Sequence, residues 1–113
     1  IERVKNAEPI KLVGQTGLKI NPVFADDAAA ALEVAISRGL NSEFNVAGAE
    51  VVSLREIVEE TGRIIKRSPN LELNGDGEDA MIADVSKISE YWKPKTSWKE
   101  GLLATVKSLV NYQ

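Results

Sequence analysis

Two copies of one helix-start signal constrain the fold of this 113-residue chain more than any other feature. Ser53 and Glu56 stand three positions apart ahead of an apolar run, and Ser97 and Glu100 repeat the arrangement. In such a capping box the two side chains bond backbone N–H groups that the first helical turn leaves free. The sequence therefore predicts that one helix begins at each serine.

Apolar residues at helical spacing follow both signals and also fill a third segment, which begins at Asp26 or Asp27 and ends before Gly39. A glycine in that place is typical of a helix end. A short turn of helix is expected before Pro94, because proline opposes continuation of a helix. The predicted helices cover residues 26–38, 53–66, 86–91 and 97–109.

Short apolar runs flanked by turn residues lie between the helices and indicate strands. These runs cover residues 10–13, 22–25, 43–47 and 71–73. Alternation of strands and helices is typical of α/β layers. We therefore expect an α/β fold in which helices pack on a small mixed sheet, with residues 1–113 forming one domain.

Composition excludes several kinds of site. The chain has no cysteine and no histidine, which rules out disulfides, Cys/His zinc sites and catalysis through imidazole, and we expect no metal site. A formal net charge of −3 without a basic stripe argues against a nucleic-acid partner. No apolar run is long enough to span a bilayer and no signal peptide is evident, so we expect a cytoplasmic protein.

Tyr91 and Lys95 have the spacing of the acid–base pair of short-chain dehydrogenases. In that pair a lysine one helical turn away lowers the pKa of the phenol. Pro94 stands between the two residues and opposes the continuous helix that the pair requires. We interpret Tyr91 as an anchoring aromatic residue and expect no catalytic residue in this chain.

The glycine pairs Gly14/Gly17 and Gly75/Gly77 are incomplete matches to a dinucleotide fingerprint, and we interpret both as turns. Asp26 and Asp27 are interpreted as helix caps, since adjacent residues point in different directions and no third metal ligand follows.

Asn45 lies at the end of a predicted strand, beside Ala47 and Gly48. Ligands gather at the carboxyl ends of strands in open α/β sheets. A ligand contact and a polar residue that closes a strand are equally compatible with this position.

Three longer blocks occur in the order found in extended short-chain dehydrogenases of the NAD(P)-dependent epimerase/dehydratase family. INPVFADDAAAALEVAI (20–36) resembles the family's V-D-D-x-A-x-A segment, and EFNVAGAEVVSLREIVEETGRI (43–64) resembles its Y-N-V-G-G-G-E-x-x-S-L-R-E block. DVSKISEYWKPKTSWKEGLLATV (84–106) resembles the terminal D-x-S-K block, and residues 1–19 fit the stretch before the first block. The resemblance covers essentially the whole chain.

The resemblance implies a C-terminal, substrate-binding region whose parent enzyme has an N-terminal Rossmann domain upstream. That missing domain would hold NAD or NADP and carry the catalytic pair, so this chain alone would bind no cofactor. The substrate would be a nucleotide sugar. Unpaired strand edges left by the missing domain invite self-association.

Roles carried over from the family follow position by position. Leu12 and Val13 match the strand that packs on the nucleotide base, and Asn45 matches an asparagine near the diphosphate. Asp27 matches an aspartate that starts a helix and orders the adjoining loop. Lys19 and Asn21 belong to the segment that contacts the substrate.

The chain departs from the family where many members grip the diphosphate with arginine. Ile20 occupies that position with Lys19 beside it, and a lysine is a point charge without the bidentate fork of a guanidinium. An atypical member with another substrate, or a self-standing binding module, therefore stays open as an alternative.

Overall fold

The structure is a computed structural model that describes the backbone of residues 1–111 and the side chains of residues 1–109. Its elements combine four α-helices, one short 3-10 helix and five strands. In chain order they are α1 (Glu2–Lys5), β1 (Pro9–Val13), β2 (Lys19–Ile20), α2 (Ala25–Ser37), β3 (Val52–Ser53), α3 (Leu54–Ile65), β4 (Asn70–Asn74), β5 (Ala80–Met81), η1 (Ile88–Glu90) and α4 (Trp98–Asn111).

The strands form two small sheets. β1 and β4 pair in parallel, from Pro9 opposite Asn70 to Val13 opposite Asn74. In the second sheet β2 lies in the centre, antiparallel to β3 and parallel to β5. The expected α/β fold with a small mixed sheet and packed helices is thereby confirmed.

The predicted helices are all present, and two predicted strands are wrong. Residues 22–25 form no strand, because Pro22 lacks an N–H and Phe24 already serves as the N-cap of α2. Residues 43–47 have no backbone–backbone hydrogen bond to any residue that the structure describes. Their composition favours a strand, but they have no neighbour to pair with. The strands β2, β3 and β5 were not predicted.

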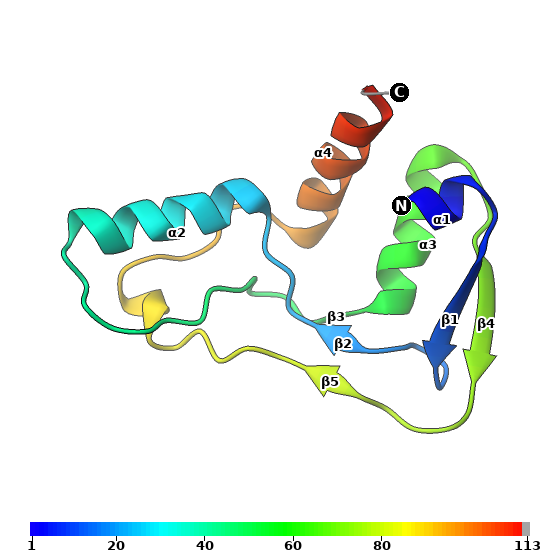
Figure 1. Ribbon diagram of the computed structural model, residues 1–113, viewed down its shortest axis with the longest axis horizontal. Coiled ribbons are helices and arrows are strands. Elements are labelled where there is room, and N and C mark those ends of the chain that lie inside the picture. The colour runs from blue at the N-terminus through cyan, green and yellow to red at the C-terminus, as the bar shows by residue number, and fades with distance from the viewer. Residues whose placement is uncertain (112–113) are drawn as a thin grey trace.

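The chain forms a flat, open body. Its extents are 46 × 37 × 16 Å and its radius of gyration is 16.0 Å, whereas a compact domain of this length has a radius of gyration of about 13 Å. Figure 1 shows α2 and η1 at one end, and α1, α3, α4, β1 and β4 at the other. The β2–β3–β5 sheet runs between the two ends (Figure 1).

A small hydrophobic core lies beneath α2. Ala31, Ile88 and Trp92 are buried there. The partly buried residues around them come from the segments before α2, before β3 and before η1; they include Val23, Phe44, Val46 and Val85. The core therefore depends on extended segments that belong to neither sheet.

The opposite side of α2 carries a second apolar stripe that nothing covers in the described structure. Ala25, Ala29, Leu32 and Ile36 share this side because they are spaced by three or four residues. Leu32 is 63% exposed and Ile36 is 73% exposed. A helix that is apolar on both sides is typical of a buried helix.

The capping box of α3 is complete. The Ser53 hydroxyl accepts the Glu56 N–H at 3.1 Å, and the Glu56 carboxylate accepts the Ser53 N–H at 2.7 Å. Ser53 also belongs to β3, so the helix start is fixed to the central sheet.

Substitution Ser53→Ala should lower the free energy of unfolding by about 1 kcal/mol, because it removes the acceptor for the Glu56 N–H. Urea denaturation followed by circular dichroism measures this change. Ser68→Ala is the matched control, since Ser68 is exposed in the loop after α3. Equal effects of the two substitutions would contradict the assignment.

Candidate functional site

The central sheet continues past its last backbone pair through a side chain. The Asn21 amide donates to the Ala83 carbonyl at 2.9 Å and accepts the Ala83 N–H at 3.0 Å. Asn21 thereby extends the pairing of β2 with β5 by one step, just before Pro22. Its amide oxygen and nitrogen are both engaged with the protein backbone.

Asn45 contacts the next residue of the same segment. Its amide nitrogen donates to the Asp84 carbonyl at 3.3 Å, and the residue is exposed. Asn21 and Asn45 are thus brought together on residues 83–84. A ligand contact by Asn45 stays a prediction.

The carboxylate of Asp84 closes the turn that follows. Its Oδ1 accepts the Ser86 N–H at 2.9 Å, and this bond lowers the pKa of the Asp84 carboxyl.

Lys19 lies two residues before Asn21 on the central strand. Its ammonium is 3.9 Å from the Glu78 carboxylate, on a side chain that is 40% exposed. Lys19 borders a shallow cavity of about 400 Å³ that also touches β3 and the first turns of α3. The lining residues are Thr16, Lys19, Val51, Val52, Ser53, Arg55, Glu56 and Glu59. This cavity is the candidate ligand site that the central sheet offers.

Arg55 is the second cation of this cavity, and its bonds are internal. Its Nε donates to Glu59 Oε1 at 2.8 Å, and its Nη1 donates to the Gln15 carbonyl at 2.8 Å. The guanidinium therefore fixes the loop before β2 onto α3.

Leu12 and Val13 lie on β1, in the other sheet, and point to opposite faces. Leu12 is 2% exposed, and its side chain lies against Gly17. Val13 is 60% exposed. Of the two, Val13 is the residue that a ligand could reach in this structure.

The interpretation of Asp26 and Asp27 as helix caps is wrong. The N-cap of α2 is Phe24, and no side chain caps it. Asp27 is 6% exposed, and its Oδ2 accepts the Thr96 N–H at 2.9 Å and the Lys95 N–H at 3.2 Å. The buried carboxylate fastens α2 to the segment that leads into α4.

Glu50 is a structural residue that the sequence did not indicate. Its carboxylate accepts the Trp98 N–H at 3.0 Å, which caps α4 from the loop before β3. At the same helix start the Ser97 hydroxyl accepts the Glu100 N–H at 3.2 Å. One half of the predicted second capping box, the bond from the Glu100 N–H, is therefore present. In place of the other half, the Glu100 carboxylate accepts the Ser97 hydroxyl at 2.9 Å.

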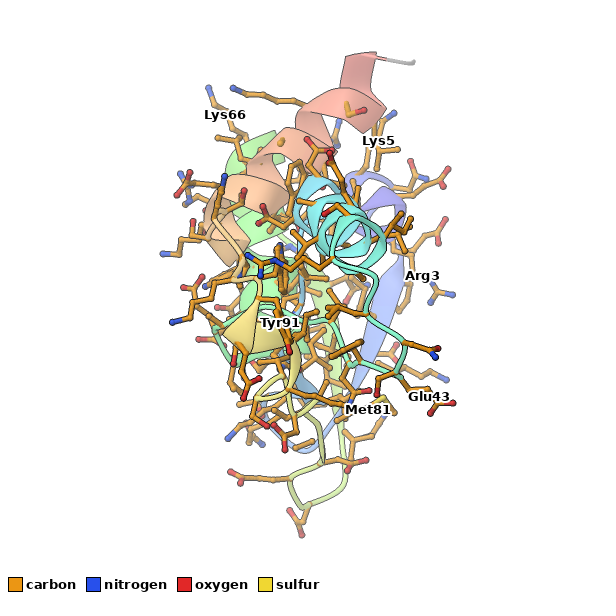
Figure 2. All side chains as sticks on the ribbon, turned by 90° about the vertical axis from the view of Figure 1, so that its left-hand side faces the viewer. Arg3, Lys5, Glu43, Lys66, Met81 and Tyr91 are labelled. Atoms are coloured by element: carbon orange, nitrogen blue, oxygen red, sulfur yellow. The ribbon has the colours of Figure 1, made fainter. Side chains whose placement is uncertain are left out.

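Tyr91 and Lys95 do not share a helix. Tyr91 follows η1, with its ring edge-on to Phe44 at 6.4 Å and the Arg38 guanidinium 5.8 Å from its centre. Figure 2 shows Tyr91 below α2, beside the ribbon that carries η1. The backbone N–H of Lys95 donates a hydrogen bond to the Asp27 carboxylate instead. The geometry is that of an aromatic anchor.

Two further kinds of site are absent from the described part of the chain. Within the described residues, no group of three or more acidic side chains is arranged to hold a metal ion. Over the same residues, no helix is both long and apolar enough to cross a bilayer.

No family model and no curated protein sequence matches the chain. Solved structures do match. UDP-glucose 4-epimerase from Thermus thermophilus, in complex with NAD, has a TM-score of 0.78 and 21% identity over 99% of this chain. dTDP-glucose 4,6-dehydratase from Bacillus anthracis, in complex with NAD, has a TM-score of 0.79 and 21% identity over 97% of it. UDP-glucose 4-epimerase from Thermotoga maritima, with UDP-glucose, has a TM-score of 0.75 and 26% identity over 98%.

The chain spans only 37–39% of the length of these three enzymes. Its fold is that of a part of NAD-dependent UDP-sugar 4-epimerases and dTDP-glucose dehydratases. The expected resemblance to the epimerase/dehydratase family is thereby confirmed at the level of the fold.

Substitution Asp27→Ala should lower the free energy of unfolding by about 1–3 kcal/mol, because it leaves two N–H groups without their acceptor. Asp26→Ala is the matched control, since Asp26 is exposed on the same helical turn. Urea denaturation compares the two variants. Hydrogen exchange at Lys95 and Thr96 should accelerate in Asp27→Ala alone, and unchanged exchange there would contradict the assigned bonds.

Proposed function

We propose that this chain is the substrate-side, C-terminal region of an NAD(P)-dependent epimerase or dehydratase that acts on a nucleotide sugar. The observation that carries the proposal is the coverage: the matched region includes nearly the whole chain but about two-fifths of each enzyme. The region would recognise the substrate and contribute no catalytic residue. NAD or NADP would be held by the remaining part of the parent.

Two uncovered surfaces support a missing partner domain. One is the outer stripe of α2, formed by Ala25, Ala29, Leu32 and Ile36, which exposes apolar area to water. The other is the extended segment 43–47, whose backbone groups lack backbone partners in the described structure. Backbone N–H and C=O groups are normally paired in native folds. Both surfaces lie around α2, so one further α/β layer at this end could cover them.

The substrate would contact the central sheet and its cavity. Lys19 lines the cavity, and Asn21 and Asn45 fix the neighbouring residues 83–84. Val13 is the exposed residue of β1. Leu12 lies on the buried face of β1, so it would support this strand without touching the substrate.

The chain alone should bind no NAD, because it has no complete dinucleotide fingerprint. Isothermal titration calorimetry with NAD measures this, and tight binding would refute the proposal. The same chain produced within its full reading frame should bind NAD, which is the positive control. A full frame that lacks an upstream glycine fingerprint would also count against the proposal.

The chain alone should self-associate in concentrated solution, since β5 is an exposed edge of the central sheet. Met81 is 73% exposed on this edge, and Met81→Lys should reduce association because edge lysines oppose strand pairing. Ser68→Lys is the control, as it adds the same charge at an exposed position in the loop after α3. Size-exclusion chromatography over a wide concentration range provides the measurement. A monomer at every concentration would contradict the predicted self-association.

A further inference from the structure

The loop between β4 and β5 begins with an asparagine–glycine pair whose chemistry the proposed function does not use. Asn74 is the last residue of β4, and Gly75 is the first residue of the loop that leads to β5. An asparagine–glycine pair commonly closes a hairpin, but β4 and β5 belong to different sheets. The φ of Gly75 is +71°, a conformation that favours glycine. The pair therefore forms a surface turn between two sheets.

Both residues of this turn are open to water. Asn74 and all residues of the loop 75–79 are exposed. A Cβ built on Gly75 would have no atom within 4 Å apart from those of the adjoining residues, so no other segment crowds the turn. The Gly75 N–H donates to no backbone carbonyl in the part of the chain that the structure describes. The backbone nitrogen of Gly75 and the side-chain amide carbon of Asn74 are therefore both accessible.

These two groups can react with each other, because glycine has no Cβ to shield its backbone nitrogen. Solvent base removes the proton of the Gly75 amide, and the nitrogen attacks Cγ of Asn74. The new N–Cγ bond closes a cyclic imide, while the Cγ–Nδ2 bond breaks and ammonia leaves with a proton from water. Water then opens the imide, either at Cγ to give aspartate or at the main-chain carbonyl carbon to give isoaspartate. Water is the only co-reactant of this sequence, and no group is oxidised or reduced.

Other asparagines of the chain lack this arrangement, since an asparagine–glycine pair occurs once in the sequence. Asn41 is also exposed in a loop, but it precedes Ser42, whose Cβ stands beside the nitrogen that would attack. Asn21 precedes Pro22, which has no N–H. The Asn21 amide is also bonded to the Ala83 backbone at both its oxygen and its nitrogen. The reaction is therefore expected at one position.

The place of this turn links the reaction to the central sheet. Isoaspartate sends the main chain through the Cβ of residue 74, which lengthens the path to β5 by one carbon. The loop has little room for it on one side, because a Cβ on Gly14 would lie 2.2 Å from the Gly77 carbonyl oxygen. Farther along the loop, the Asp79 carbonyl accepts the Lys19 N–H at 2.9 Å and so ties the start of β5 to β2. A longer turn therefore displaces the residues that make this bond.

We propose that Asn74 is a site of spontaneous deamidation, and that its isoaspartyl product weakens the pairing of β5 with β2. Each converted chain carries one negative charge more than the formal −3 of the unmodified chain. The inference is independent of the proposed function, because it rests on the chemistry of one exposed turn and on the bonds beside it.

Incubation of the purified chain in mildly alkaline buffer, followed by peptide mapping with tandem mass spectrometry, tests the site. The peptide that contains Asn74 should gain about 1 Da, the difference between an amide and a carboxylic acid, and should separate into an aspartyl and an isoaspartyl form. The rate should rise with pH, since the attacking nitrogen must lose its proton. The peptide that contains Asn41 is the internal control and should keep its mass. Conversion at Asn41 with Asn74 intact would overturn the inference.

Two variants separate the reaction from its consequence. Asn74→Gln should gain no mass, because the longer side chain would have to close a larger ring. Freshly prepared Asn74→Asp supplies the added charge without the longer main chain. Hydrogen exchange at Lys19 should therefore accelerate in the aged chain but not in Asn74→Asp, and equal rates in the two would overturn the predicted effect on the sheet. A folded chain that keeps its mass while the urea-unfolded chain converts would overturn the assignment of the site in the native structure.

Discussion

The buried carboxylate of Asp27 is the interaction on which the arrangement of this chain depends. It joins the first turn of α2 to the backbone of Lys95 and Thr96, just before α4 begins. These bonds join the two helices where the Phe24 side chain lies close to Gly101 of α4. Glu50 makes a second tie of the same kind to Trp98. Each tie places a charged acceptor on otherwise unpaired N–H groups, which is the stronger class of hydrogen bond.

Other local contacts hold the extended segments in place where they belong to no sheet. Asn21 uses its side-chain amide to pair with Ala83 where Pro22 interrupts the backbone ladder. Gly48 allows the neighbouring loop to approach closely, since a Cβ there would lie 1.9 Å from the Pro22 carbonyl oxygen. Residues 43–47 follow this course without backbone partners in the described structure, although the Glu43 carbonyl accepts the Lys87 ammonium at 3.1 Å.

Local signals in the sequence predicted what local physics determines. The capping box at Ser53 and Glu56 is present as expected, because both partners lie within one helical turn. The two-residue strands β2, β3 and β5 were missed, because pairing with distant residues defines them and no alternation pattern marks them. Asp27 was misread for the same reason: an acidic residue at a helix start suggests a cap, but its partners lie 68 and 69 residues away. At the candidate site, the sequence indicated Lys19 and Asn21 but not the neutralising position of Glu78.

The shared fold and the local side-chain charges describe different properties of this chain. The shared fold concerns the course of the backbone, and it relates the chain to a part of larger NAD-dependent enzymes. Chemistry at a site is decided by the side chains grafted on that backbone. Beside Lys19 the Glu78 carboxylate lies 3.9 Å from the ammonium, while the apolar row of Val52, Ile20 and Met81 crosses the same sheet.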